Sequence, residues 1–326
     1  MDGFVRLPIP PAGNAPVGDA PAGDSVGWKQ RTLKAAIDCV GVGVHSGRRV
    51  TLTIRPAPVD HGIVFRRTDL RRTIPARSEN VVDTRLCTVL ADPAMPSARV
   101  GTVEHLMAAL SGLAVDNALI ELDGPEIPIL DGSAAPFVFL LDCAGLTGQD
   151  APRRVMEIRR TVRVTAGEAW AELRPLGPVS RSVPPVLEMD LSIDFAASAI
   201  GRQSVSMQLT PDSFRREIAS ARTFAQAAEV EQLQAAGMAR GGSLDNAIVV
   251  DGPNILNPGG LRMANEFAGH KLLDVVGDLA LTGSRLHGRF VAHRPGHQLN
   301  NRLIQALFAD TAAWRMVETE PLNAAA

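Results

Sequence analysis

Apolar and polar positions in the first half of the chain follow two different periods. Residues 50–55 (VTLTIR) alternate apolar and polar side chains, which is typical of a half-buried strand. Leu106, Ala109, Leu110 and Leu113 instead recur three or four residues apart, which favours a helix. The patterns predict strands at 50–55, 63–67 and 117–122, a helix at about 103–113, a turn-rich stretch at 124–133, and a further helix or strand at 136–144.

The second half repeats the order of strands followed by helices. We expect strands at 156–164, 186–195, 247–250 and 290–293, a helical pattern at 211–236, and helices at about 267–281 and 300–309. Two successive units of this make-up suggest two α+β domains, although no internal sequence repeat is present. The polar residues 145–153, with two glycines and a proline, are the best candidate for the junction. The predicted domains are therefore 29–148 and 149–326.

Residues 1–28 differ from the rest of the chain in composition. They contain five prolines and five glycines with no periodic apolar pattern. Such a segment buries too little apolar surface to offset the entropy of ordering it. We therefore predict a disordered N-terminal extension.

Composition narrows the class of protein. Among the 326 residues, 45% are hydrophobic and 21% charged, the balance of a soluble globular protein. A formal net charge of −2 provides no general attraction for nucleic acid or an anionic membrane. No apolar run reaches the roughly 18–20 residues of a membrane span, and the N-terminus lacks a secretory signal pattern. Cys39, Cys87 and Cys143 are far apart, which fits reduced thiols. We expect a cytoplasmic protein.

Two histidines stand beside carboxylates on predicted helices. Glu104 and His105 lie where the first helix should begin; an acidic helix start with a neighbouring surface histidine is the plainer interpretation. His270, Asp274 and Asp278 are spaced i, i+4, i+8 and so share one helix face. A histidine and an aspartate four residues apart can bind one metal ion. Most of that helix is apolar, and buried charges need partners.

A third histidine, His297, follows a turn at the start of the last helix. The positive end of a helix disfavours imidazolium, so a protonated His297 would need a carboxylate such as Asp278. The segment GVGVHSG at 41–47 lacks the dinucleotide-binding spacing and leads into a strand, which argues against a Rossmann site. Neither HExxH nor GxSxG occurs in the chain. Spacing alone thus supports only a three-ligand hydrolytic metal site with an open position for water.

Several long blocks in order resemble one family, the UDP-3-O-acyl-N-acetylglucosamine deacetylases. The similarity runs from about residue 29 to residue 310, and its strongest blocks are GVGVHSG at 41–47, TVEHLMAALSGLAVDNALIELDGPEIPILDGSAAPF at 102–137, ARTF at 221–224, GGSLDNAIVV at 241–250, NEFAGHKLLDVVGDLALTG at 265–283 and GHQLNNRL at 296–303. The resemblance implies two similar α+β domains packed helix layer to helix layer as a β-α-α-β sandwich, with the active site between them.

The resemblance also implies roles for particular residues. A zinc ion would be held by His105, His270 and Asp274, although Fe(II) suits the same ligands. Glu104 would be the general base toward the attacking water, and His297 the general acid for the leaving amine. The hydroxyl of Thr223 would stabilise the oxyanion, and Asp278 would orient His297.

Substrate contacts follow from the same resemblance. Lys271 resembles the family's contact to the nucleotide sugar, and Asp194 with Phe195 resembles its uridine pocket. An acyl-chain passage should be built from the insert at 223–245; its candidate liners are Phe224, Val230, Leu233, Met238 and Leu244. The family pattern continues Thr-Phe with Gly-Phe, whereas this chain has Ala225-Gln226. This difference affects the expected length of the acyl chain and leaves the expected chemistry unchanged.

The implied reaction is hydrolysis of the N-acetyl group of UDP-3-O-(3-hydroxyacyl)-N-acetylglucosamine, giving UDP-3-O-acyl-glucosamine and acetate. This is the committed step of lipid A, and hence lipopolysaccharide, biosynthesis. A UDP-sugar lipid is the expected partner, with no nucleic acid and no transmembrane segment, and we expect a monomer. Two alternatives remain open: a metal-dependent deacetylase acting on another acetamido sugar, and a catalytically silent sugar-nucleotide binder.

Overall fold

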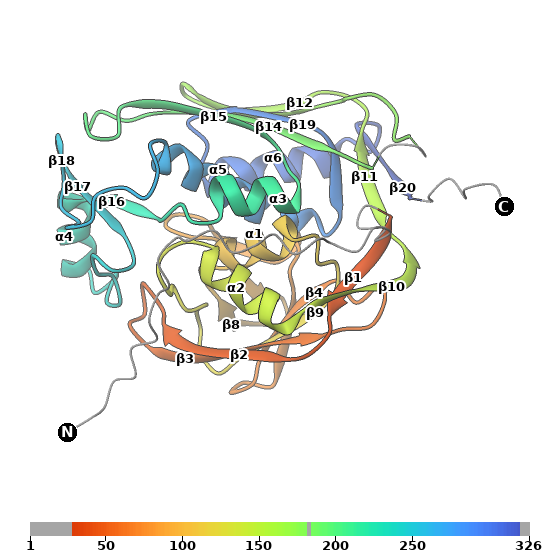
Figure 1. Cartoon of the computed structure of the whole chain (residues 1–326), viewed down its shortest axis with the longest axis horizontal. Coiled ribbons are helices and arrows are strands. Elements are labelled where there is room, and N and C mark those ends of the chain that lie inside the picture. The colour runs from red at the N-terminus through yellow and green to blue at the C-terminus, as the bar shows by residue number, and fades with distance from the viewer. Residues whose placement is uncertain (1–27, 181–183, 320–326) are drawn as a thin grey trace.

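The computed structural model describes residues 28–180 and 184–319, and these form four layers (Figure 1). A sheet lies on each outer side, and two layers of helices lie between the sheets. The predicted α+β class with helix layers packed face to face is confirmed. The predicted disordered extension at 1–28 lies, apart from Trp28, outside the described residues.

The first unit has a five-stranded mixed sheet in the order β2-β3-β9-β4-β5. Along β3, Val50, Leu52 and Ile54 alternate with exposed or half-buried residues, so the sheet buries one face under the helices. Its elements are β2 (Ile37–Val42), β3 (Arg49–Pro56), β4 (Ile63–Arg67), β5 (Arg72–Pro75), β9 (Ala118–Leu122), the small sheet of β6 (Val81–Asp83), β7 (Val89–Asp92) and β8 (Met95–Val100), a 3-10 turn at Ser78–Asn80, and the helices α1 (Glu104–Gly112) and α2 (Ala135–Ala144).

The second unit has a seven-stranded sheet around the long strand β19. Its inner face includes Leu187, Met189, Leu191 and Ile193 of β14, all buried. The strands are β11 (Arg154–Ile158), β12 (Val162–Ala166), β13 (Ala169–Arg174), β14 (Leu187–Asp194), β15 (Arg202–Gln208), β19 (Arg285–His293) and β20 (Trp314–Glu318). The helices are α3 (Pro211–Ser213), which continues as a π-helical turn at Phe214–Ile218, α5 (Glu266–Leu279) with a 3-10 turn at Ala280–Thr282, and α6 (His297–Ala309).

Two smaller groups complete the fold. β16 (Phe224–Gln226), β17 (Ile248–Asp251) and β18 (Asn254–Ile255) form a three-stranded sheet next to α4 (Ala227–Ala235); this group lies at the left of Figure 1. β1 (Lys29–Leu33) pairs antiparallel with β10 (Leu146–Pro152). No helix among the described residues is long and apolar enough to cross a membrane.

The inner helices α1 and α5 pack against each other at very short range. Gly277 of α5 faces the backbone of Glu104: a Cβ atom at Gly277 would lie 2.8 Å from the Glu104 carbonyl carbon. Ordinary van der Waals contact begins at about 3.4 Å, so only glycine permits this approach. The contact fixes the start of α1 against the middle of α5.

Two predictions about secondary structure are wrong. The helical pattern at 211–236 is interrupted, because residues 224–226 pair with β17 and tertiary pairing overrides the helix propensity of the alanines. The strand expected at 156–164 is two strands, since Arg159 and Arg160 turn out of the sheet and donate backbone hydrogen bonds to Ala313. The polar segment 145–153, for which no helix or strand was predicted, is mostly the strand β10, and its place as a domain junction stays a prediction.

Candidate active site

The start of α1 brings Glu104 and His105 into the protein interior. Their exposed fractions are 3% and 4%. Thr102, just before the helix, has a left-handed backbone with φ 55°, which is uncommon outside glycine. Its hydroxyl donates a 3.0 Å hydrogen bond to Glu126 Oε1, and Glu126 also accepts from the backbone of His45 and Ser46. The Glu126 carboxylate therefore holds the chain that leads into Glu104.

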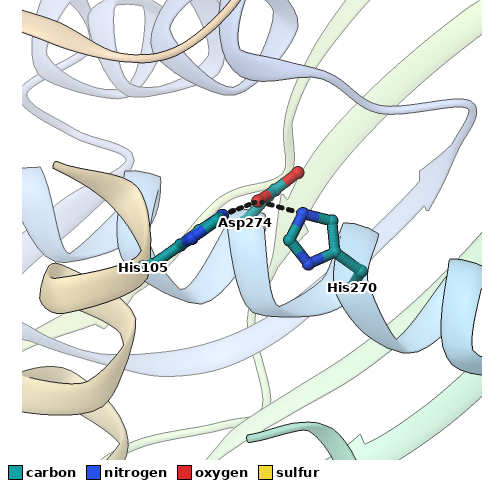
Figure 2. A group of neighbouring side chains, drawn as sticks. All are labelled: His105, His270 and Asp274. Atoms are coloured by element: carbon teal, nitrogen blue, oxygen red, sulfur yellow. Dashed lines mark ion pairs between the residues drawn. The ribbon is translucent and has the colours of Figure 1, made fainter. Parts of the chain in front are cut away.

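His270 and Asp274 lie one turn apart on α5 and meet His105 from α1 (Figure 2). Asp274 Oδ1 is 3.3 Å from His270 Nε2 and 3.6 Å from His105 Nε2. One ligand atom from each of the three residues can be chosen so that all lie within 4.8 Å of one another. The two residues that helical spacing predicts as possible ligands, His270 and Asp274, thus form a buried cluster of three potential metal ligands together with His105.

The protonation of this cluster favours a cation between the three side chains. His270 Nδ1 lies 3.0 Å from the Ala221 carbonyl oxygen, and because a carbonyl only accepts, Nδ1 carries the proton. The lone pair of Nε2 then faces Asp274 Oδ1, which is buried and has no hydrogen-bond donor among the described residues. Burial lowers the pKa of His270 to about 3, so its imidazole is neutral. Two facing acceptors in the interior are unfavourable unless a positive ion lies between them. The donor set fits a catalytic metal with three protein ligands.

Asp278, one turn beyond Asp274, is saturated with hydrogen bonds. It accepts from Thr88 Oγ1 at 2.6 Å and from Asn300 Nδ2 at 2.8 Å, and its Oδ2 lies 2.9 Å from His297 Nδ1. Burial acts to lower the pKa of His297, but Asp278 and then Glu104 outweigh it and raise that pKa to about 10. His297 is therefore an imidazolium at neutral pH, although it opens α6.

Glu104 faces the same space as His297. Its Oε1 is 3.6 Å from His297 Nε2, and its Oε2 accepts a hydrogen bond of 3.1 Å from the Thr88 backbone. Burial raises the pKa of Glu104, while His297 and His105 act to lower it. A carboxylate with a raised pKa beside an imidazolium forms a pair that can accept one proton and donate another.

The three potential metal ligands line one cavity of about 400 Å³ together with Glu104 and His297. Thr223 and Lys271 also belong to its polar part. The apolar part is lined by α4 and the segments around it; of the predicted passage residues, it includes Phe224, Val230, Leu233 and Leu244. Met238 is not part of this lining and is 37% exposed. No residue of α4 is buried, because its apolar side chains face the cavity instead of a packed core.

Of the residues expected to contact the nucleotide, Phe195 and Lys271 lie close to Phe224, whereas Asp194 pairs with a residue elsewhere. Phe224 packs edge to face on Phe195 with ring centroids 5.5 Å apart, and Lys271 Nζ lies 5.5 Å from the centre of the Phe224 ring. Lys271 Nζ also donates a 3.0 Å hydrogen bond to Asp274 Oδ2. Asp194 instead pairs with Arg202 on the neighbouring strand at 2.8 Å.

Several residues that organise the site gave no separate signal in the sequence. Thr88 immediately precedes β7, a strand that was not predicted, and Asn300 was predicted only as part of the last helix. The buried pair of Arg222 and Glu266 joins the segment before Thr223 to the first turn of α5, with Nε to Oε1 at 2.8 Å. Arg222 directly precedes Thr223, and Glu266 lies one helical turn before His270. Nothing in the sequence indicates that these two side chains pair, because the pairing depends on how the chain folds.

Comparison with known proteins decides the family. A family model described as UDP-3-O-acyl N-acetylglycosamine deacetylase matches residues 30–309. The UDP-3-O-acyl-N-acetylglucosamine deacetylase of Actinobacillus pleuropneumoniae serotype 3 is 47% identical over 296 residues, which cover 90% of this chain and 94% of that protein. The chain belongs to this deacetylase family.

A second relative extends the comparison. The protein of the same name from Shewanella violacea is 46% identical over 295 residues, covering 89% of this chain and 93% of its own length. The part matched by the deacetylase family model includes every residue of the cavity described above, from Val44 to His297 at the start of α6. The family resemblance seen in the sequence is confirmed.

Proposed function

We propose that the chain removes the N-acetyl group of UDP-3-O-(3-hydroxyacyl)-N-acetylglucosamine by metal-dependent hydrolysis, releasing acetate and the free amine, as the committed step of lipid A biosynthesis. One observation carries the proposal: three buried ligand atoms lie beside the Glu104–His297 pair in a cavity that becomes apolar away from them. A small amide bond fits the polar part, and an acyl chain fits the apolar part.

The metal would be held by His105, His270 and Asp274, and we propose zinc. When bound there, zinc supplies Lewis acidity, which polarises a carbonyl and lowers the pKa of water toward 7. Fe(II) would suit the same nitrogen and oxygen ligands. The hydrogen bond from His270 Nδ1 to Ala221 orients the ring so that Nε2 is available as the ligand atom.

Glu104 and His297 divide the proton transfers. Glu104 takes a proton from the attacking water at its carboxylate, and His297 Nε2 gives a proton to the leaving amine nitrogen. Their separation of 3.6 Å allows both to reach groups on one amide. Asp278 acts through His297, because its charge and its contact with Nδ1 keep the ring protonated and oriented. The Thr223 hydroxyl donates to the developing oxyanion.

The remaining proposals concern the residues that bind the substrate, the two domains, and the cellular location and oligomeric state of the protein. Lys271, Phe195 and Asp194 would bind the nucleotide sugar, and Phe224, Val230 and Leu244 would line the acyl passage. The cluster of Phe195, Phe224 and Lys271 next to His270 supports a sugar-proximal subsite. We also propose that residues 29–148 and 149–326 are the two domains, and that the protein acts as a cytoplasmic monomer.

The test compares zinc-loaded wild-type protein with Glu104→Ala on UDP-3-O-(3-hydroxyacyl)-N-acetylglucosamine. Loss of a general base lowers the rate by about 10²–10⁴-fold, and zinc content should stay at the wild-type value. Glu79→Ala, which removes an exposed carboxylate, is the matched control. Loss of zinc from Glu104→Ala would contradict the assignment of Glu104 as base. A wild-type protein that binds zinc but turns over only another acetamido sugar, or none, would support the alternative substrates or a silent binder.

A further inference from the structure

The two units also meet around a polar cavity of about 120 Å³ at the end of α1 opposite to Glu104. Arg77 and Asp116 from the first unit line it, as do Arg154, Ser284 and Arg285 from the second. None of these residues lines the cavity that contains His105 and His270. The cavity is therefore separate from the candidate active site.

Two guanidinium groups converge here from different units. Arg77 packs against the backbone just before Arg285: a Cβ atom at Gly283 would lie 2.8 Å from Arg77 Cζ. The half-buried Arg285 makes one long hydrogen bond, from Nη1 to the Ser111 carbonyl oxygen at 3.4 Å. Burial and then the Arg153 guanidinium lower the pKa of Arg285 to about 10, while the Asp116 carboxylate acts to raise it. Of the two positive charges, that of Arg285 thus lies where solvent screens it poorly.

The two carboxylates that line the cavity, Asp60 and Asp116, are hydrogen-bonded to groups other than these two arginines. Asp116 is occupied by Arg153, whose Nε and Nη2 donate at 2.8 and 2.6 Å. Asp60 accepts from the Gln30 amide at 2.9 Å and lies 3.6 Å from Arg154 Nη2. Among the residues that the structure describes, no carboxylate forms an ion pair with Arg77 or Arg285. The cavity therefore holds a surplus of positive charge in a partly desolvated setting.

We propose that this cavity between the two units binds a phosphate group, held by the guanidinium groups of Arg77 and Arg285 with Arg154 and Ser284 at its edge. A guanidinium presents planar, paired N–H donors that match phosphate oxygens, and several of them around one site favour a doubly charged oxyanion. Because Arg77 and Arg285 belong to different units, an anion bound between them links the units. Ligand binding to the folded state alone also raises stability.

Isothermal titration of the zinc-loaded full chain at constant ionic strength tests the proposal. The probes are inorganic phosphate and glucose 1-phosphate, which separate a free ion from a phosphate ester. Arg77→Gln and Arg285→Gln should each weaken binding of the preferred probe at least about tenfold. Arg71→Gln removes an equal charge from an exposed turn and should bind like wild type. The preferred probe should also raise the unfolding temperature of wild type and not of Arg77→Gln.

Two results would overturn the proposal. One is the absence of binding for both probes up to millimolar concentration. The other is equal affinity in wild type, Arg77→Gln and Arg285→Gln, which would mean that phosphate binds elsewhere, for example at the metal ligands. Arg77 is exposed, so its variant should fold even if Arg285→Gln does not, and deacetylase activity of Arg77→Gln should remain at the wild-type level.

Discussion

Replacing Gly277 by alanine should separate the proposed metal ligands of α5 from Glu104, the proposed base at the start of α1. The added Cβ would clash first with the carbonyl oxygen of Glu104 and would lie 2.8 Å from its carbonyl carbon and 3.0 Å from its Cα, where ordinary contact begins at about 3.4 Å. The obstacle is backbone, so the two helices must move apart by at least about 0.6 Å, and overpacking of this kind costs about 1–3 kcal/mol. Displacements on the order of 1 Å reduce rates by up to about 100-fold, so kcat/KM should fall between about tenfold and 100-fold.

Gly269→Ala on the same helix is the matched control. There the new Cβ would be 3.4 Å from Ala221 Cβ, an ordinary contact, and alanine is about 1 kcal/mol better than glycine inside a helix. Deacetylation at saturating zinc and denaturant unfolding should be measured for both variants. Equal activity and stability of Gly277→Ala and Gly269→Ala would refute the claim that this helix contact sets the geometry of the site.

Three further changes test other parts of the account. A general acid must be protonated, so on the alkaline side wild-type kcat should fall as pH rises toward the His297 pKa of about 10; Asp278→Asn should move this alkaline limb toward 6.5, and an unmoved limb would argue against His297 as the acid. Glu266→Ala leaves Arg222 buried without its carboxylate and should lower the free energy of unfolding by about 3–5 kcal/mol; an unchanged unfolding midpoint would contradict the role of that pair. Val230→Trp should raise KM for long acyl chains more than for short ones, and equal effects on both would exclude Val230 from the passage.

Much of the layered fold could be predicted from periodicity. α1, α5 and β14 lie within one or two residues of the predicted ranges, because each has a regular apolar face. The segment 211–236 could not be predicted in this way. Its alanines favour a helix, but hydrogen bonding of residues 224–226 to β17 depends on a strand more than twenty residues away. Likewise, residues 145–153 have the polar composition of a linker, and their pairing with β1 is a long-range property.

The candidate site was predictable to different degrees. His270 and Asp274 were connected by helical spacing alone, whereas their meeting with His105 required either family resemblance or the packed structure. The importance of Asp278 for His297 followed from electrostatics, because a protonated imidazole at a helix start needs a nearby carboxylate. Thr88 and Asn300, which also bond Asp278, have common polar side chains whose roles depend on a tertiary arrangement.

The most direct test of the central claim is a deacetylase assay on UDP-3-O-(3-hydroxyacyl)-N-acetylglucosamine with metal-stripped protein, before and after addition of one equivalent of zinc. The account predicts negligible turnover without metal and release of acetate once zinc is added, with Asp274→Ala failing to recover activity. Undiminished turnover by the metal-free protein, or full recovery in Asp274→Ala, would contradict a metal-dependent mechanism at His105, His270 and Asp274.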